Sequence, residues 1–211
     1  MIRPQTRGAL FIVVEGPNGV GKTTASTLLA ARLRADGARV HLTSEPSRTP
    51  LGRLIRADES RLRGRALALA VAADRYHHLA TEITPALEDG QTVISDRYVQ
   101  SSLVLQRLDG LEVEEIWQYN AHVLPASLSC YLHHTAQELG RRLAERARLS
   151  RLEQAGSPER ELDLYRDTYR FLLARHWPQA IVDCQDRSPD RVAAELAMLV
   201  ARTAQRQEDI R

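Results

Sequence analysis

The stretch EGPNGVGKTT, residues 15–24, has the residue types and spacing of a loop that binds phosphate groups. Gly16, Gly21, Lys22 and Thr23 fit the pattern G-x-x-x-x-G-K-[ST], and the apolar run before them predicts a strand that leads into a helix. Glycines let backbone N–H groups turn toward an anion, and the helix N-terminus adds a positive dipole. The sequence therefore predicts a site for ATP formed by Gly16, Pro17, Asn18, Gly19, Val20, Gly21, Lys22, Thr23 and Thr24.

Two side chains of this loop have predicted tasks of their own. Lys22 is the single lysine among 29 basic residues, and its compact charge, which an arginine fork does not reproduce, reaches the outer phosphates. The hydroxyl of Thr23 is expected to coordinate Mg²⁺. Asp96 closes the apolar run TVISD, which places a carboxylate beside the loop, where it could hold Mg²⁺ directly or through water. The alternative is that Asp96 caps the next helix and Arg97 pairs with a surface acid.

Strand and helix patterns alternate along the chain. The runs at 9–14, 38–44, 92–96, 128–132 and 180–184 predict five strands. Helical patterns follow the loop and span about 65–88, 136–146, a segment opening near Ser157, and about 189–204. The alternation predicts an α/β fold with a parallel sheet, helices on both faces, and ligands at the carboxyl ends of the strands.

Composition limits the class of protein. A length of 211 residues fits one domain, and the net charge of +2 is scattered, so no nucleic-acid polymer is expected as a partner. Cys130 and Cys184 lie in apolar strands, which predicts buried thiols and a reducing compartment. Glu15 interrupts the first apolar run too early for a secretion signal, and no run approaches the roughly 18 apolar residues of a membrane span. We expect a cytoplasmic protein without a membrane partner.

Histidine and tyrosine pairs have structural interpretations. The adjacent side chains of His77–His78 and of His133–His134 point in divergent directions, and no Cys or acidic residue stands at ligand spacing, so no zinc site is predicted. Tyr165 and Tyr169 lie four residues apart on a predicted helix, where packing is the commoner role.

Four stretches together resemble the thymidylate kinase family: EGPNGVGKTT, TSEPSRTPLGRLIR at 43–56, AADRYHHLATEITPAL at 72–87 and SDRYVQSSLVLQ at 95–106. ARLSRLEQ resembles the arginine-bearing lid of the family, and IVDC resembles its last strand. The resemblance implies a P-loop NTPase-type parallel five-stranded sheet, a homodimer, and Mg-ATP-dependent phosphorylation of a nucleoside monophosphate, dTMP above all. The alternatives are a related kinase of another nucleotide or phosphorylated metabolite, and a non-catalytic module in which ATP serves as a switch.

The resemblance also implies roles for individual residues. Arg97 would bind the acceptor phosphate, Arg75 would read the acceptor base, and the loop of Glu45 would approach the acceptor and the metal. Arg48 would contact the acceptor phosphate, while Ser102 and Gln106 keep the family pattern. The alternatives are a turn without chemistry at Glu45 and a helix-surface arginine at Arg75.

Residues 17–20 contain no arginine, so the lid, at about 146–157, is expected to supply the catalytic one. Arg146, Arg148 and Arg151 are the candidates, and Arg148 and Arg151 are spaced to share one helical face. The alternative for each is a solvated basic patch.

Four departures from the family pattern are clustered on the acceptor side. Val71 replaces an aromatic residue that stacks on thymine, and Leu105 replaces a tyrosine near the deoxyribose. Asn18 replaces an acidic residue, and His133 follows a strand that commonly ends in aspartate. These departures predict an acceptor other than, or in addition to, dTMP.

Overall fold

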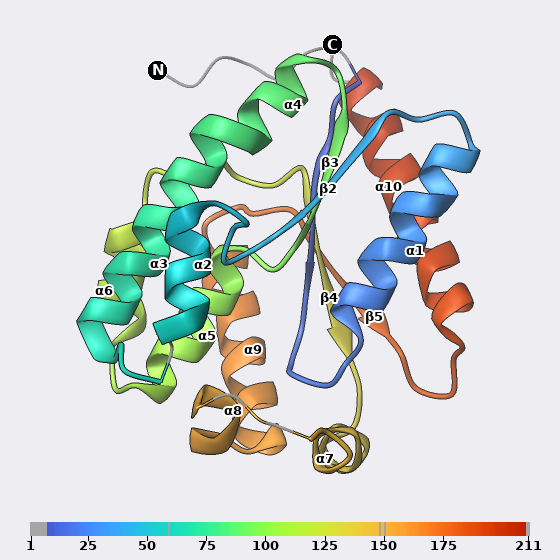
Figure 1. Ribbon diagram of the computed structural model, residues 1–211. Coiled ribbons are helices and arrows are strands. Elements are labelled where there is room, and N and C mark those ends of the chain that lie inside the picture. The colour runs from blue at the N-terminus through green and yellow to red at the C-terminus, as the bar shows by residue number, and fades with distance from the viewer. Residues whose placement is uncertain (1–7, 59, 148, 150, 210–211) are drawn as a thin grey trace.

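One sheet of five parallel strands organises the molecule. The computed structural model describes residues 8–58, 60–147, 149 and 151–209. The strands are β1 (Phe11–Glu15), β2 (Val40–Ser44), β3 (Thr92–Asp96), β4 (Leu128–His133) and β5 (Gln179–Asp183), in the order β2-β3-β1-β4-β5 (Figure 1). All five predicted strands and the P-loop type of sheet are confirmed.

Helices cover both faces of the sheet. On one face lie α1 (Lys22–Ala35) and α10 (Pro189–Asp209) (Figure 1). The other face is covered by α3 (Gly64–His78), the π-helix η1 (Leu79–Ile83), α4 (Thr84–Glu88), α5 (Val99–Leu108), α6 (Val113–Asn120) and α9 (Pro158–Leu173). The described residues also form three further short helices: α2 (Pro50–Asp58), α7 (Ala136–Ala144) and α8 (Arg151–Ala155).

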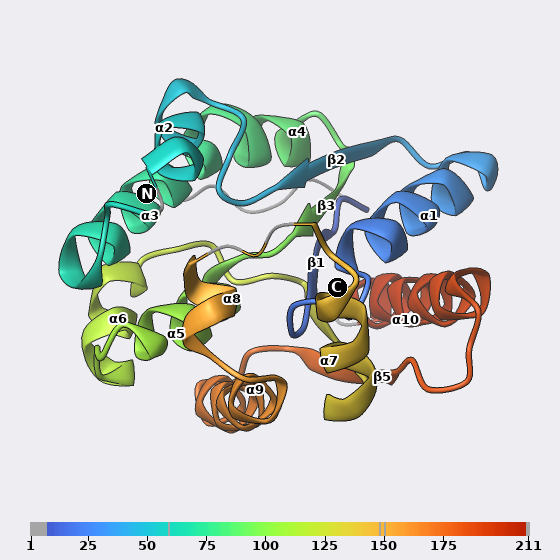
Figure 2. The ribbon, with the colours of Figure 1, turned by 60° about the horizontal axis from the view of Figure 1, so that its bottom comes forward.

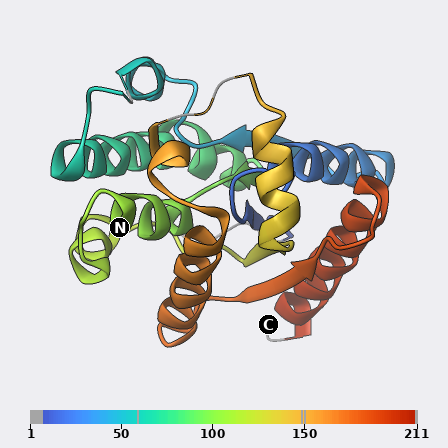
Figure 3. The same cartoon turned by 90° about the horizontal axis from the view of Figure 1, so that it is seen from below.

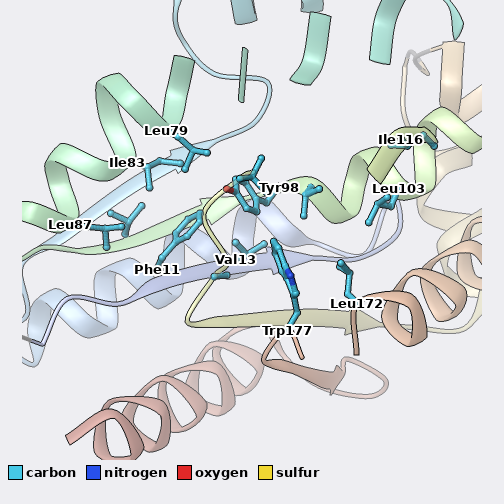
Figure 4. Close-up of a cluster of buried hydrophobic side chains, with 14 of the residues drawn as sticks. Phe11, Val13, Leu79, Ile83, Leu87, Tyr98, Leu103, Ile116, Leu172 and Trp177 are labelled. Carbon is cyan, nitrogen blue, oxygen red and sulfur yellow. The ribbon is translucent and has the colours of Figure 1, made fainter. Parts of the chain in front are cut away.

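The central strand β1 is buried on both sides, which explains its continuous apolar run. Phe11 and Val13 pack into the cluster beneath α3, α5 and α9, where Tyr98 and Trp177 also lie (Figure 4). Ile12 and Val14 point the other way, into the cluster with the inner faces of α1 and α10. A strand with two covered faces gains from an apolar residue at every position.

Residues 65–88, where the sequence shows a helical pattern, form one continuous helix that contains a π-helical turn. Pro85 has no N–H, and its ring would clash with the carbonyl one turn earlier in a regular helix. Just before it, the amide of Thr84 donates to the carbonyl of Leu79, five residues back, so η1 is a π turn. The predicted extent is confirmed, while the π turn is a feature that the helical spacing did not indicate.

The carboxyl ends of the strands meet at one edge of the sheet, the lower one in Figure 1. The register pairs Val14 and Ser44 with Asp96, and Glu15 with Tyr131. Helices α7 and α8 lie at this same end of the molecule (Figures 2 and 3). None of the helices within the described residues is long and apolar enough to cross a bilayer. The cytoplasmic setting stays a prediction.

Gly52 in α2 allows this helix to approach the loop after β2. A Cβ at Gly52 would overlap the carbonyl oxygen of Ser47, whereas a Cβ at Gly140 in α7 would meet its nearest neighbour, Pro158 Cγ, at 3.8 Å. Gly52→Ala should therefore lower the free energy of unfolding by about 1–3 kcal/mol. The matched Gly140→Ala should raise it by about 0.5–1 kcal/mol, because alanine favours the helix. Urea unfolding measures both, and equal effects would contradict the close approach.

Candidate active site

The phosphate-binding loop joins β1 to α1 and depends on its glycines. Gly16, Gly19 and Gly21 have φ angles of 142°, 83° and 102°, which L side chains rarely adopt. A Cβ on Gly16 would also lie 2.5 Å from the carbonyl oxygen of Leu132 in β4. The loop is thus pressed against the neighbouring strand, and its backbone turns at points that only glycine tolerates.

Lys22 folds back over this loop. Its ammonium donates to the carbonyl oxygens of Gly16 at 2.7 Å and Pro17 at 2.9 Å, and only 5% of the residue is exposed. Burial, aided by the nearby charge of Arg97, lowers the pKa of Lys22 to about 7. A phosphate placed in the loop would add negative charge beside this buried ammonium and favour its charged form.

Thr23 and Asp96 meet beside the loop, as predicted from their positions. The Thr23 hydroxyl donates to Asp96 Oδ2 at 2.6 Å, while Oδ1 of Asp96 is buried and has no hydrogen-bond partner among the described residues. This aspartate contacts the loop and makes no cap on α5, whose first residue is Val99. A carboxylate with an unused oxygen beside a hydroxyl is a ligand pair suited to Mg²⁺.

A cavity of about 350 Å³ opens next to the loop. Seven of the eight residues predicted to bind the substrate line it: Glu45, Val71, Arg75, Arg97, Ser102, Leu105 and Gln106. Asn18 of the phosphate loop lines it as well, so the loop and the cavity share a wall. Val71 and Leu105 contribute to an aliphatic side of the cavity together with Leu67.

Arg75 is a buried cation within this cavity wall. The residue is 1% exposed, and its Nε donates to Glu45 Oε2 at 2.7 Å. Its Nη2 donates to Ser102 Oγ at 2.9 Å, and Asn120 Oδ1 accepts from Nη1. The helix-surface alternative for Arg75 is therefore wrong, whereas the role of Glu45 in the chemistry stays a prediction. A buried pair of this kind holds each partner in place, because removal of one would leave the other charge uncompensated.

Arg97 connects the cavity to the phosphate loop. Its Nη2 donates to Asn18 Oδ1 at 2.6 Å, and its Nη1 donates to Ser101 Oγ at 3.0 Å. The backbone of Arg97 is left-handed, with a φ of 76°. The alternative in which Arg97 pairs with a surface acid is wrong, since its guanidinium faces inward between the loop and α5.

Other predicted residues lie elsewhere or outside the described chain. Arg48 is exposed and does not line the cavity, whereas Arg56 of α2 does. Arg146 Nη1 donates to Glu153 at 2.6 Å, and Arg151 Nη2 donates to Asp109 Oδ2 at 2.8 Å. Arg148 lies outside the described residues. The catalytic role of a lid arginine stays a prediction, and for Arg151 it requires release from Asp109.

Four residues at the site have no predicted role from the sequence. Glu15 interrupts an apolar run, and that interruption is the signal for a buried functional carboxylate. Arg56 is the last residue of the stretch TSEPSRTPLGRLIR at 43–56. Arg142 of α7 donates to the carbonyl oxygen of Gly19 at 3.3 Å and lines a further cavity with Gln185. Glu161 of α9 accepts from the Asn18 amide at 2.9 Å, and no local pattern indicates it.

A phosphate-binding loop after the central strand, beside a separate cavity lined by arginines, defines the class of P-loop phosphotransferases. The sequence profile of the thymidylate kinase family matches residues 14–178. The chain therefore belongs to the thymidylate kinase family.

Individual relatives agree with the family profile. A thymidylate kinase of Leifsonia xyli subsp. xyli is 39% identical over 202 residues, which cover 92% of this chain and 95% of the relative. A probable thymidylate kinase of Pyrococcus abyssi is 41% identical over 152 residues, 68% of this chain and 74% of the relative. The crystal structure of thymidylate kinase from Ehrlichia chaffeensis superposes with a TM-score of 0.70 at 24% identity, covering 92% of this chain and 99% of that one. This structural likeness supports the fold.

The lowered pKa of Lys22 predicts proton uptake on nucleotide binding. At about pH 8 the lysine of the empty loop is largely neutral, because its pKa is about 7, and bound phosphates favour the charged form. Binding of ATP should take up roughly one proton per site at that pH. Calorimetric titration in two buffers of different ionisation enthalpy measures the uptake. Uptake that persists in Lys22→Met, or is missing from the wild type, would contradict this assignment.

Proposed function

We propose that this chain phosphorylates a nucleoside monophosphate with ATP, and that dTMP is its main acceptor. The observation that carries the proposal is the bond between Asn18 and Arg97, 2.6 Å long, at the point where the phosphate loop and the cavity meet. Phosphoryl transfer depends mainly on positioning two anionic substrates in line and on neutralising their charge. Lys22 on the donor side and Arg97 on the acceptor side supply that charge. The named relatives support thymidylate as the acceptor.

Mg²⁺ belongs to the proposal as the partner of the donor phosphates. Thr23 and Asp96 would hold it, and the fit rests on the buried Oδ1 of Asp96, which lacks a hydrogen-bond partner among the described residues. The ion supplies neutralisation of the charge on the transferred phosphoryl group. The adenine of ATP would occupy the cavity beside Arg142, on the other side of the loop from the acceptor.

Gln106 supports a base that carries a ring N–H. The residue is 3% exposed, lines the acceptor cavity, and its Oε1 has no hydrogen-bond partner among the described residues. Thymine and uracil offer N3–H to such an acceptor, while cytosine has a bare acceptor at N3. Because an unpaired buried polar atom costs free energy, the amide orientation in this structure favours thymine and uracil, and cytosine requires the amide to rotate so that its N–H pairs with N3.

The lid and the dimer are further parts of the proposal. Leu152 and Glu153 of α8 line the acceptor cavity, which supports a lid at about 146–157 that closes over the substrates. The resemblance to thymidylate kinases implies a homodimer, and the exposed Leu69 of α3 is an apolar side chain that such a contact would cover. Light scattering of the purified chain tests the dimer.

The acceptor is tested by an assay of ADP release with Mg-ATP and six monophosphates: dTMP, dUMP, dCMP, UMP, CMP and GMP. We expect dTMP to react best and dUMP to follow within roughly 10–200-fold, since one methyl group is worth about 1–3 kcal/mol. For dCMP we expect lower turnover than for dTMP, because the Gln106 amide has to rotate before its N–H can pair with the cytosine N3. Turnover of dCMP equal to that of dTMP would contradict the role of Gln106. Robust turnover of another acceptor alone would favour the altered specificity that Val71 and Leu105 suggest, and silence with all six would overturn the kinase proposal.

Lys22→Met separates a kinase from a module that merely binds ATP. Loss of the ammonium removes charge stabilisation of the transferred group, so turnover should fall by at least roughly 10²-fold while the melting temperature stays close to that of the wild type. Arg32→Met on the exposed side of the same helix is the control and should keep full turnover. A Lys22→Met enzyme of normal activity would refute the role given to the lysine.

A further inference from the structure

Helix α9 holds the phosphate loop through two side chains that are one helical turn apart. Glu161 Oε1 accepts from the backbone amide of Asn18 at 2.9 Å, and the Tyr165 hydroxyl donates to Glu15 Oε2 at 3.0 Å. Both residues of α9 are 5% exposed. One contact is with Glu15, just before the loop, and the other is with Asn18, the third residue of the loop counted from Gly16. One face of α9 therefore positions the loop at two points.

Asn18 connects Glu161 to Arg97. Its backbone N–H is bound by Glu161, and its side-chain Oδ1 accepts from Arg97 Nη2 at 2.6 Å. A guanidinium can only donate, so the side-chain oxygen of Asn18 must face Arg97. Glu161, Asn18 and Arg97 thus form one chain of contacts that runs from α9, through the donor loop, to the acceptor arginine.

The carboxylate of Glu161 is placed where its charge opposes substrate binding. It lies near Lys22 and Arg97, the two cations assigned to the phosphates, and burial raises its pKa. Glu153 adds a repulsion that acts in the same direction. A buried carboxylate weakens the attraction between the two cations and the anionic substrates. We therefore look for a benefit of Glu161 in the positions of the residues that it contacts.

We propose that Glu161 is a positioning residue, which fixes the third residue of the phosphate loop and, through Asn18, orients Arg97 toward the acceptor phosphate. The role rests on the proposed kinase function. It assigns no contact between Glu161 and either substrate. Glu161 affects the reaction through the position that it gives Arg97 before the acceptor binds.

Two variants of similar volume separate the hydrogen bond from the charge. Glu161→Gln keeps an oxygen that can accept from the Asn18 amide, whereas Glu161→Met fills the same space without an acceptor. We expect Glu161→Met to lower kcat by about 10–100-fold and to raise KM for the monophosphate, with KM for ATP nearly unchanged. Glu161→Gln should retain most of kcat. Asp163→Ala, on the exposed side of the same helix and paired with Arg166, is the control and should leave the kinetics unchanged.

A double-mutant cycle tests whether the effect passes through Asn18. If it does, Asn18→Ala combined with Glu161→Met should cost much less than the sum of the two single losses in free energy of activation. Additive losses, equal losses in Glu161→Gln and Glu161→Met, or a loss in kcat with the KM of both substrates raised alike would overturn the proposal. The last pattern is that of a general structural defect.

Hydrogen exchange of the unliganded chain gives a readout that needs no turnover. Glu161→Met should accelerate exchange of the Asn18 amide, while Glu161→Gln and Asp163→Ala should leave it near the wild-type rate. An unchanged rate in Glu161→Met overturns the positioning role, whatever the enzyme catalyses. A wild type that is silent with every monophosphate overturns the kinase proposal alone, so the two failures are distinguishable.

Discussion

The site depends on the hydrogen bonds that the buried carboxylate of Glu15 accepts. Its oxygens accept from the amides of Tyr98 at 2.7 Å and Ser101 at 3.0 Å, and from the Tyr165 hydroxyl at 3.0 Å. The first amides of a helix lack partners within it and attract negative charge, so a carboxylate at the start of α5 is well placed. Because the phosphate loop begins one residue later and Arg97 immediately precedes Tyr98, the donor and acceptor sides of the site share one anchor.

This anchor lets the chain tolerate an unfavourable backbone at Arg97. A left-handed non-glycine residue costs on the order of 1–3 kcal/mol and persists only where surrounding contacts determine it. Here the amide of Arg97 donates to the carbonyl of Val14 at 3.1 Å, and its carbonyl accepts from Ser95 Oγ at 2.7 Å. The strained turn directs the guanidinium toward Asn18 instead of continuing β3. The cost of the turn is therefore tied to the position of an arginine that contacts the phosphate loop and lines the acceptor cavity.

The sequence predicted the features that depend on local patterns. Strand β1 is a short apolar run with two covered faces, and the phosphate loop is a fixed spacing of glycines, so both could be located by residue number. The choice between Arg48 and Arg56 could not be made in the same way. It depends on how α2 is rotated, and the close approach of Gly52 to Ser47 sets that rotation. The role of Glu161 was harder still to predict from the sequence, because its partner Asn18 is 143 residues away in the chain.

Charge balance explains why a site for two anions contains so many carboxylates. Lys22 is buried and Arg97 is half-buried, and burying a charge without a partner is costly. In the empty site, the negative charges of Glu15, Asp96 and Glu161 favour the charged form of Lys22 while burial opposes it. The side chains of Lys22 and Arg97 thus stand in their working positions before any substrate is present, and bound phosphates complete the charging of Lys22, at the cost of some attraction for phosphate. A preorganised site of this kind spends little on reorganisation when charge develops in the transition state. The acidic residues that weaken ground-state binding are, on this reasoning, the same ones that keep the cations in place for phosphoryl transfer.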